Sequence, residues 1–152
     1  ENSKKNHDEV FTRLYRYLLR PDIYYVAYQH IYSNKGAGTK GVTDDTADGF
    51  SEIYIENIIE ALKNEMYQPK PVRRTYIKKS NGKMRPLGLP VFTDKLIQEA
   101  IRMILEAIYE PIFSDYSHGF RPKRSCHTAL AQIKKRIYRS TLVYRGRYKR
   151  MF

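Results

Sequence analysis

A turn signal in the middle of the chain, Asn81-Gly82, constrains the fold most strongly. It lies between two short runs, 72–79 and 84–89, that have the composition of β-strands. Asn-Gly favours a tight hairpin turn because both residue types tolerate positive φ. The prolines in and after the second run restrict it to an edge or a short strand. We therefore predict a β-hairpin here.

Apolar residues recur at helical spacing on both sides of the hairpin. Pro21 is expected at the first position of a helix, and Ser51 and Thr93 are expected as helix caps. The predicted helices are 8–19, the segment from Pro21, a helix from Ser51 that carries Met66 on its apolar stripe, 93–110 and 125–138. Loops are predicted over 33–41 and 114–124. The fold class is α+β and mainly helical, in one compact unit with a loose end.

The charge of the chain is unevenly distributed. Its 152 residues carry 28 Lys and Arg against 16 Asp and Glu, a net charge of +12. Residues 116–152 hold 11 of these cations and no acid. Such a block indicates a surface for polyanions or a basic tail, with nucleic acid as the favoured partner.

Other classes of protein are disfavoured by composition. No apolar run is long enough to span a membrane, and no secretory signal precedes the first predicted helix. The single cysteine, Cys126, excludes an internal disulfide and a multi-cysteine zinc site. We expect a cytoplasmic protein, with Cys126 buried near a helix cap rather than acting as a nucleophile.

The predicted hairpin is strongly basic. Strand alternation places Arg73 and Lys79 on one face, and Arg74 and Lys78 on the other. A hairpin of this kind can clamp phosphates, and we favour that role over an exposed hairpin made soluble by lysines. The segment 68–85 holds no acid and seven cations: Lys70, Arg73, Arg74, Lys78, Lys79, Lys83 and Arg85.

Two loops carry further candidate sites. The glycine-rich loop 36–41 formally matches a dinucleotide fingerprint, but no strand precedes it, and we expect it to let a polyanion approach its backbone. Three aspartates follow at 44, 45 and 48, and we attribute them to helix-entry electrostatics rather than to a metal site. The loop 117–125 combines an aromatic side chain with three cations, as single-stranded RNA binding requires. His118 alone is more typical of a structural histidine.

These segments together resemble a known family. Residues 76–90, 93–98 and 118–122, with Asn34-Lys-Gly and Thr39-Lys-Gly upstream, resemble the reverse transcriptase/maturase encoded by bacterial group II introns. The resemblance covers about residues 8–136. It implies the fingers part of a right-hand polymerase, with a role in intron splicing and mobility.

The resemblance also implies roles for individual residues. Lys79 and Arg85 match positions that contact the phosphates of the incoming nucleotide. Gly119–Pro122 matches a loop beside the template, and the early glycine-rich segment matches a contact with template or intron RNA. The candidate RNA-binding residues are Lys35, Lys40, Arg73, Arg74, Lys78, Lys83, His118, Gly119, Phe120, Arg121, Lys123 and Arg124. The implied partners are RNA, an RNA/DNA duplex and a deoxynucleoside triphosphate.

The family's catalytic aspartates are not found, because no acid follows Asp115. The whole family uses Mg²⁺ held by these carboxylates, so we assign this chain no catalytic residue, metal site or cofactor and expect it to be inactive alone. Permitted codons for residues 140–152, read one base later, encode a segment similar to the missing motif. We therefore predict a frameshift near 137 and a basic, disordered tail over 137–152. The alternative is a natural basic extension.

Two functions remain open. The first is the binding part of an RNA-directed DNA polymerase, and the second is a stand-alone RNA-binding module that aids splicing. A basic structural or ribosome-associated protein is disfavoured by the ordered motifs. Apolar surface on the last two helices predicts self-association.

Overall fold

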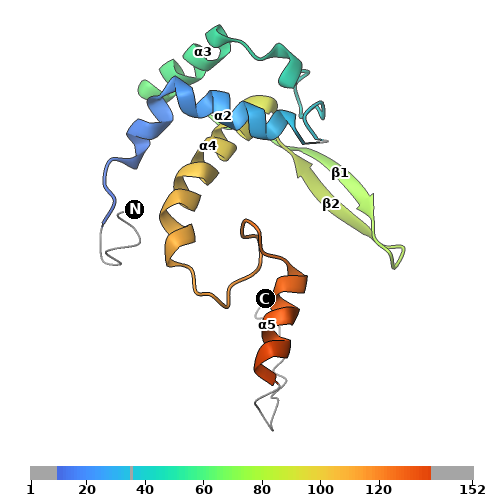
Figure 1. Ribbon diagram of the computed structural model, residues 1–152. Helices are drawn as coiled ribbons and strands as arrows, with labels where there is room; N and C mark the ends of the chain where they lie inside the picture. The colour runs from blue at the N-terminus through green and yellow to red at the C-terminus, as the bar shows by residue number, and fades with distance from the viewer. Residues whose placement is uncertain (1–9, 35, 138–152) are drawn as a thin grey trace. The chain divides into compact units, whose positions relative to one another are not determined.

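The computed structural model describes residues 10–34 and 36–137. These residues are mainly helical with one two-stranded antiparallel hairpin, which confirms that part of the predicted fold class (Figure 1). The chain forms two compact units, Glu1–Tyr109 and Glu110–Phe152, so the prediction of one compact unit is wrong. The elements are η1 (Leu14–Leu19), α2 (Pro21–Tyr32), η2 (Ala47–Gly49), α3 (Glu52–Lys63), β1 (Arg73–Lys78), β2 (Met84–Leu89), α4 (Phe92–Tyr109), η3 (Glu110–Ile112) and α5 (Cys126–Ile137).

The core of the first unit lies where α2 and α3 meet the first half of α4. Tyr24, Ile55, Phe92 and Leu96 are fully buried there, and their apolar area is the main source of stability. The Tyr24 hydroxyl donates to the carbonyl of Leu18 at 2.7 Å, which ties η1 to α2. Burial raises the pKa of Tyr24 to about 12, so this hydroxyl keeps its proton at neutral pH.

Local sequence signals fix several helix ends as predicted. Pro21 begins α2, and Ser51 caps α3 by accepting from the Tyr54 amide at 3.3 Å. Ser125 caps α5, accepting from the Thr128 amide at 3.3 Å while the Thr128 hydroxyl accepts from the Ser125 amide at 2.9 Å. These caps satisfy backbone donors that a helix leaves unpaired at its start.

The hairpin pairs Arg73 with Leu89 at its base and Lys78 with Met84 near its tip. At the turn, the Gly82 amide donates to the Lys79 carbonyl at 3.0 Å, and Gly82 has a φ of +78°. A non-glycine residue would be strained at that φ, which explains the need for glycine after Asn81. The predicted hairpin is therefore confirmed, but of the two turn residues only Gly82 takes a positive φ.

Three local predictions are wrong. Within the described residues 10–19, the predicted helix is reduced to η1, because Arg13 takes a left-handed φ of 59° and Val10 is 80% exposed. Thr93 is not a cap, because α4 begins at Phe92 and the Thr93 hydroxyl binds Tyr54 instead. Met66 lies beyond the end of α3 and is exposed.

The N-terminal residues 1–9, residue 35 and the tail 138–152 lie outside the described part of the chain. The predicted division at residue 137, the predicted frameshift and the predicted disorder of the tail all concern this last segment. They therefore stay predictions.

Candidate nucleic-acid interface

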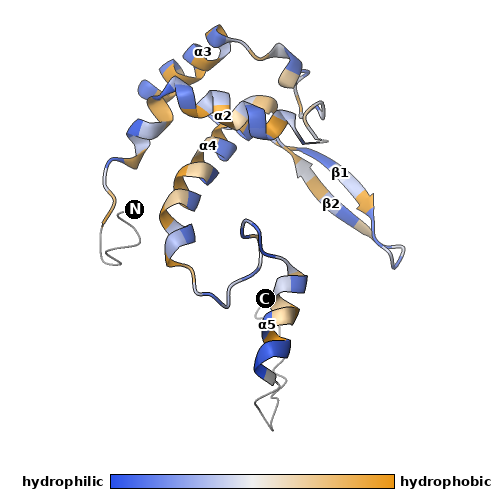
Figure 2. Ribbon diagram, viewed as in Figure 1, coloured by the Kyte–Doolittle hydropathy of each residue, from blue (hydrophilic) through white to orange (hydrophobic). Residues whose placement is uncertain are grey.

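The hairpin presents cations on both of its faces. Pairing of Ile77 with Arg85 places Arg85 on the same face as Arg73, and Arg74 and Lys78 lie on the opposite face. Every residue from Tyr76 to Gly88 is exposed, so neither face is covered by a helix along this length. Figure 2 shows hydrophilic segments on both strands, interrupted by hydrophobic ones.

No acid in the described part of the chain neutralises these cations. Among residues 10–34 and 36–137, no Asp or Glu side chain forms an ion pair with a cation of segment 68–85. An unneutralised basic hairpin exposed to solvent produces a positive potential that attracts phosphate groups. The arrangement can therefore bind a polyanion without first breaking an ion pair to a described acid.

Three side chains in the first turn of α4 each bind a different segment near the base of the hairpin. The Thr93 hydroxyl lies 2.5 Å from the Tyr54 hydroxyl of α3. Asp94, which is 5% exposed, accepts from the Tyr67 hydroxyl and, at 3.1 Å, from the Lys70 amide. Lys95 donates to the Thr39 carbonyl at 2.6 Å. Three consecutive side chains thus hold α3, the approach to β1 and the glycine-rich loop.

The glycine-rich loop also contacts β1. Arg73 donates from Nε and Nη2 to the Lys40 carbonyl, at 3.2 and 2.9 Å. The Lys40 ammonium pairs with Asp44 at 3.0 Å, on the surface. Lys35, another predicted RNA contact, lies outside the described residues. The loop and the hairpin base are therefore one connected surface of the first unit.

In the second unit, the loop between η3 and α5 carries three exposed aromatic side chains, Phe113, Tyr116 and Phe120, of which Phe120 is the most exposed. Phe120 is fully exposed, at 112%, and has a φ of 57°. Lys123 has a φ of 58°. A bulky residue rarely adopts this left-handed conformation, and such strain persists only where the surroundings hold the chain. The loop therefore presents Phe120 to solvent in a fixed, strained backbone conformation.

Arg121 supplies much of that support. Its side chain is 7% exposed and pairs with Glu110 at 2.8 Å. It also donates to the carbonyls of Ser114 and Ser117, at 2.8 and 3.0 Å, and lies over the Phe113 ring. The hydrogen bond from Arg121 holds the pKa of Glu110 below its usual value. The donors of Arg121 thus face the interior of the loop.

Of the other predicted residues of this loop, some have partners within the second unit and some are exposed. His118 contacts Thr128 at 2.9 Å and Gln132 at 2.6 Å through its two ring nitrogens, which agrees with a structural histidine. Arg124 donates to the Asp115 carbonyl at 2.6 Å. Gly119 and Lys123 are exposed. The predicted burial of Cys126 is wrong, because its position at the start of α5 leaves it exposed.

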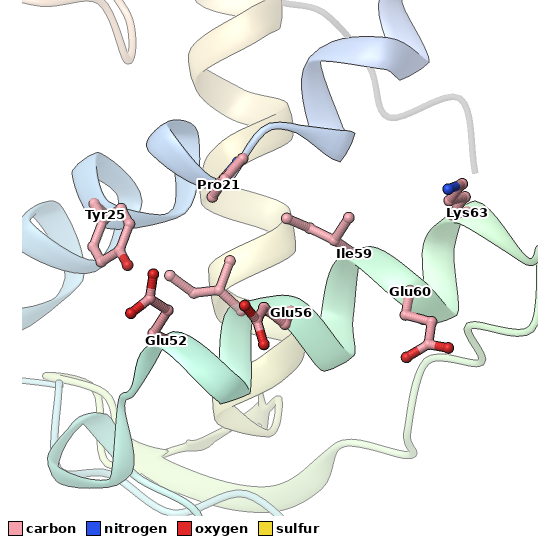
Figure 3. Close-up of a pocket in the computed structure, with 8 residues that line it drawn as sticks. Pro21, Tyr25, Glu52, Glu56, Ile59, Glu60 and Lys63 are labelled. Atoms are coloured by element: carbon pink, nitrogen blue, oxygen red, sulfur yellow. The ribbon is translucent and has the colours of Figure 1, made fainter.

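The first unit also has a groove with the opposite charge. This groove, of about 410 Å³, lies between the start of α2 and one side of α3. Figure 3 shows Pro21 and Tyr25 on the α2 side and the carboxylates of Glu52 and Glu56 on the α3 side. Glu60 and Lys63 continue the α3 side. Its net negative charge repels phosphate, so we do not assign it to the polyanion surface.

Sequence reasoning missed Lys95 and Glu110 as parts of these surfaces. Lys95 offered one signal, since a cation in the first turn of a helix faces the positive end of the helix dipole and needs a specific partner. Glu110 offered none, because its partner Arg121 lies eleven residues away across an irregular loop.

Comparison with known proteins identifies the class. Residues 77–150 match the family described as reverse transcriptase (RNA-dependent DNA polymerase). Over 136 residues, 89% of this chain, the sequence is 73% identical to the group II intron-encoded protein LtrA of Lactococcus lactis subsp. cremoris, of which the match covers 23%. The resemblance predicted from the sequence is confirmed: the chain belongs to the group II intron-encoded reverse transcriptases and maturases.

More distant relatives agree with this assignment. An uncharacterized 91 kDa protein in the cob intron of Schizosaccharomyces pombe is 47% identical over 135 residues, 88% of this chain and 17% of that protein. Nuclear intron maturase 1, mitochondrial, of Arabidopsis thaliana is 43% identical over 58 residues, 36% of this chain and 8% of that protein. The chain spans less than a quarter of the length of these relatives.

The family implies Mg²⁺, but the described acids do not fit such a site. No group of three or more His, Cys, Asp or Glu side chains in residues 10–34 and 36–137 is placed to hold a metal. Asp45 accepts from Thr43 and Tyr54, and Asp44 pairs with Lys40. We therefore derive no chemistry through a metal. No helix in these residues is long and apolar enough to cross a bilayer.

Proposed function

We propose that this chain is the fingers region of a group II intron-encoded reverse transcriptase, and that it binds template or intron RNA and nucleotide phosphates. The observation that carries the proposal is the exposed hairpin, whose cations have no acidic partner among the described residues. Lys79 and Arg85 are our candidates for the nucleotide phosphates. Arg73, Arg74, Lys78 and Lys83 are our candidates for the RNA backbone.

The loop 117–125, between η3 and α5, supports the same proposal. Phe120 offers an exposed ring on which an unpaired base can stack, and Lys123 offers a neighbouring cation. Arg121 and Arg124 are occupied within the loop, so we propose that they position it and that Phe120 makes the contact. For His118 we propose the same supporting role, because both ring nitrogens have partners.

The proposal is confined to binding. Nucleotidyl transfer by two metal ions needs a set of converging carboxylates, and we assign none in this chain. A second candidate function, a stand-alone RNA-binding module that aids splicing, rests on the same basic surface. Adding a separately purified polymerase palm from a relative distinguishes the two. Restored DNA synthesis supports the fingers role, whereas splicing help without the palm supports the module.

Self-association also stays a proposal. Ile101 and Leu105 on α4, and Leu130 and Ile133 on α5, are exposed apolar side chains at helical spacing. A partner that covers them would remove this area from water.

Fluorescence anisotropy with a labelled single-stranded RNA tests the binding proposal. We expect saturable binding that weakens as salt is raised, since neutralised phosphates release counterions. Absence of binding at low salt would contradict the proposal. A variant with Lys63→Ala is the matched control, because it removes one cation from the end of α3, outside the hairpin.

A further inference from the structure

The glycine-rich loop 36–41 is held by two cations from different elements. Lys95 of α4 donates to the Thr39 carbonyl at 2.6 Å and to the Gly36 carbonyl at 3.5 Å. Arg73 of β1 donates twice to the next carbonyl, that of Lys40, at 3.2 and 2.9 Å. The loop is therefore fastened to the helix and to the hairpin at adjacent residues.

A close backbone approach completes this attachment. A Cβ added to Gly41 would lie 2.8 Å from the backbone N and Cα of Val91, so only glycine fits there. By contrast, a Cβ added to Gly36 or Gly38 would meet nothing within 4 Å. One end of the loop is packed against the start of α4, and its glycines at 36 and 38 face open space.

The position of Lys95 has an electrostatic cost. Burial lowers its pKa, and the N-terminal end of α4 disfavours a cation. Its bonds to loop carbonyls offset this cost. Because Arg73 and Lys95 bind carbonyl oxygens, they also neutralise the negative ends of peptide dipoles that would repel a phosphate. A loop held in this way presents a surface favourable to polyanions.

We propose that Arg73 and Lys95 are positioning residues, which join the glycine-rich loop to the hairpin base so that both form one continuous RNA-binding surface. This inference rests on the proposed function. Neither residue needs to touch the RNA for this role. Loss of Lys95 would free the loop while leaving the cations of the hairpin tip, Lys78, Lys79 and Lys83, in place.

Lys95→Met tests the inference, with Lys95→Arg as the conservative variant and Lys63→Met as the control for loss of one charge. Amide hydrogen exchange of residues 36–41 is measured in the free protein, and RNA affinity is measured by anisotropy. We expect Lys95→Met to speed exchange in the loop about tenfold and to weaken RNA binding roughly three- to tenfold. Lys95→Arg keeps a charged donor, so its loop exchange and its RNA affinity should lie close to those of the wild type. Lys63→Met should change neither the loop exchange nor the RNA affinity.

Unchanged loop exchange in Lys95→Met would overturn the inference. Faster exchange with unchanged affinity would also overturn it, because the loop would then lie outside the RNA surface. If the wild-type chain fails to bind RNA, the proposed function fails, and the exchange measurement still reports on the attachment alone. If Lys95→Met does not fold, Arg73→Met, on an exposed strand, tests the attachment by loop exchange in the free protein, a readout that a direct RNA contact of Arg73 would not change, and unchanged exchange would overturn the inference.

Discussion

Arg121 donates to Glu110 from Nη2 at 2.8 Å and from Nε to both carboxylate oxygens at 3.1 Å. This fork-shaped pair joins η3 to the loop that displays Phe120. A guanidinium has five donors in a planar fork, so it can pair with both carboxylate oxygens while it also donates to two carbonyls, whereas an ammonium has only three donors. Arg121, one of the predicted RNA contacts, is thus engaged within the protein.

Removing Arg121 should release both the loop and the carboxylate. In Arg121→Ala we expect the pKa of Glu110 to rise toward its ordinary value, because the hydrogen bond that lowers it is lost. NMR titration of the Glu110 carboxyl measures this directly. Arg121→Lys should give an intermediate shift. A Glu110 pKa that does not move in Arg121→Ala would show that the pair is absent in solution.

Phe120 should matter for binding and not for stability. Its ring is fully exposed, so Phe120→Ala should change the free energy of unfolding by less than about 0.5 kcal/mol. Stacking of one base contributes about 1–3 kcal/mol, so affinity for single-stranded RNA should fall about fivefold or more. Phe120→Tyr keeps a ring and is the control. Equal affinities for the alanine and wild-type proteins would exclude the stacking role.

Asp94 should matter for stability instead. In Asp94→Ala, the Tyr67 hydroxyl and the Lys70 amide lose their acceptor in a buried site. Leaving buried donors unpaired costs roughly 2–3 kcal/mol of unfolding free energy. Urea denaturation measures this loss, and Asp94→Asn, which keeps one acceptor oxygen, should lose less. A variant as stable as the wild type would show that water replaces the carboxylate.

Glu99 should make stability depend on acid pH. Hydrogen bonds from Arg102 and His30 hold its pKa below the usual value of 4.5. Because the folded pKa lies below the unfolded one, this contribution is complete above about pH 4.5 and is lost as the pH falls through the folded pKa. Glu99→Gln should therefore flatten the acid limb of the curve of unfolding free energy against pH. An unchanged acid limb would count against the network.

Features that depend on neighbouring residues could be predicted from the sequence, whereas features that depend on tertiary contacts could not. Pro21, Ser51 and Gly82 were predicted correctly because each acts through its own backbone conformation or an adjacent amide. The role of Thr93 was predicted wrongly because its hydroxyl binds a tyrosine that is distant in the sequence. The burial of Cys126 was predicted wrongly because it depends on whether another element covers the start of α5.

The same distinction applies to the candidate site. The charge of the hairpin could be predicted because composition and alternation determine it. The direction of the Arg121 guanidinium could not, because a motif gives the residue type and not which way its side chain points. Lys95 was overlooked because its partners are backbone carbonyls, which composition does not reveal, and its place in the first turn of a helix was the one available signal.

The proposed function rests on RNA binding by the cations of the exposed hairpin. The most direct test is the slope of log K against log salt for single-stranded RNA, in the wild type and in Arg73→Ala, Lys79→Ala and Arg85→Ala. Each phosphate contact that is lost should reduce the steepness of the slope by about 0.7, and Lys63→Ala should leave it unchanged. Unchanged slopes in all three hairpin variants would contradict the account and remove the hairpin from the interface.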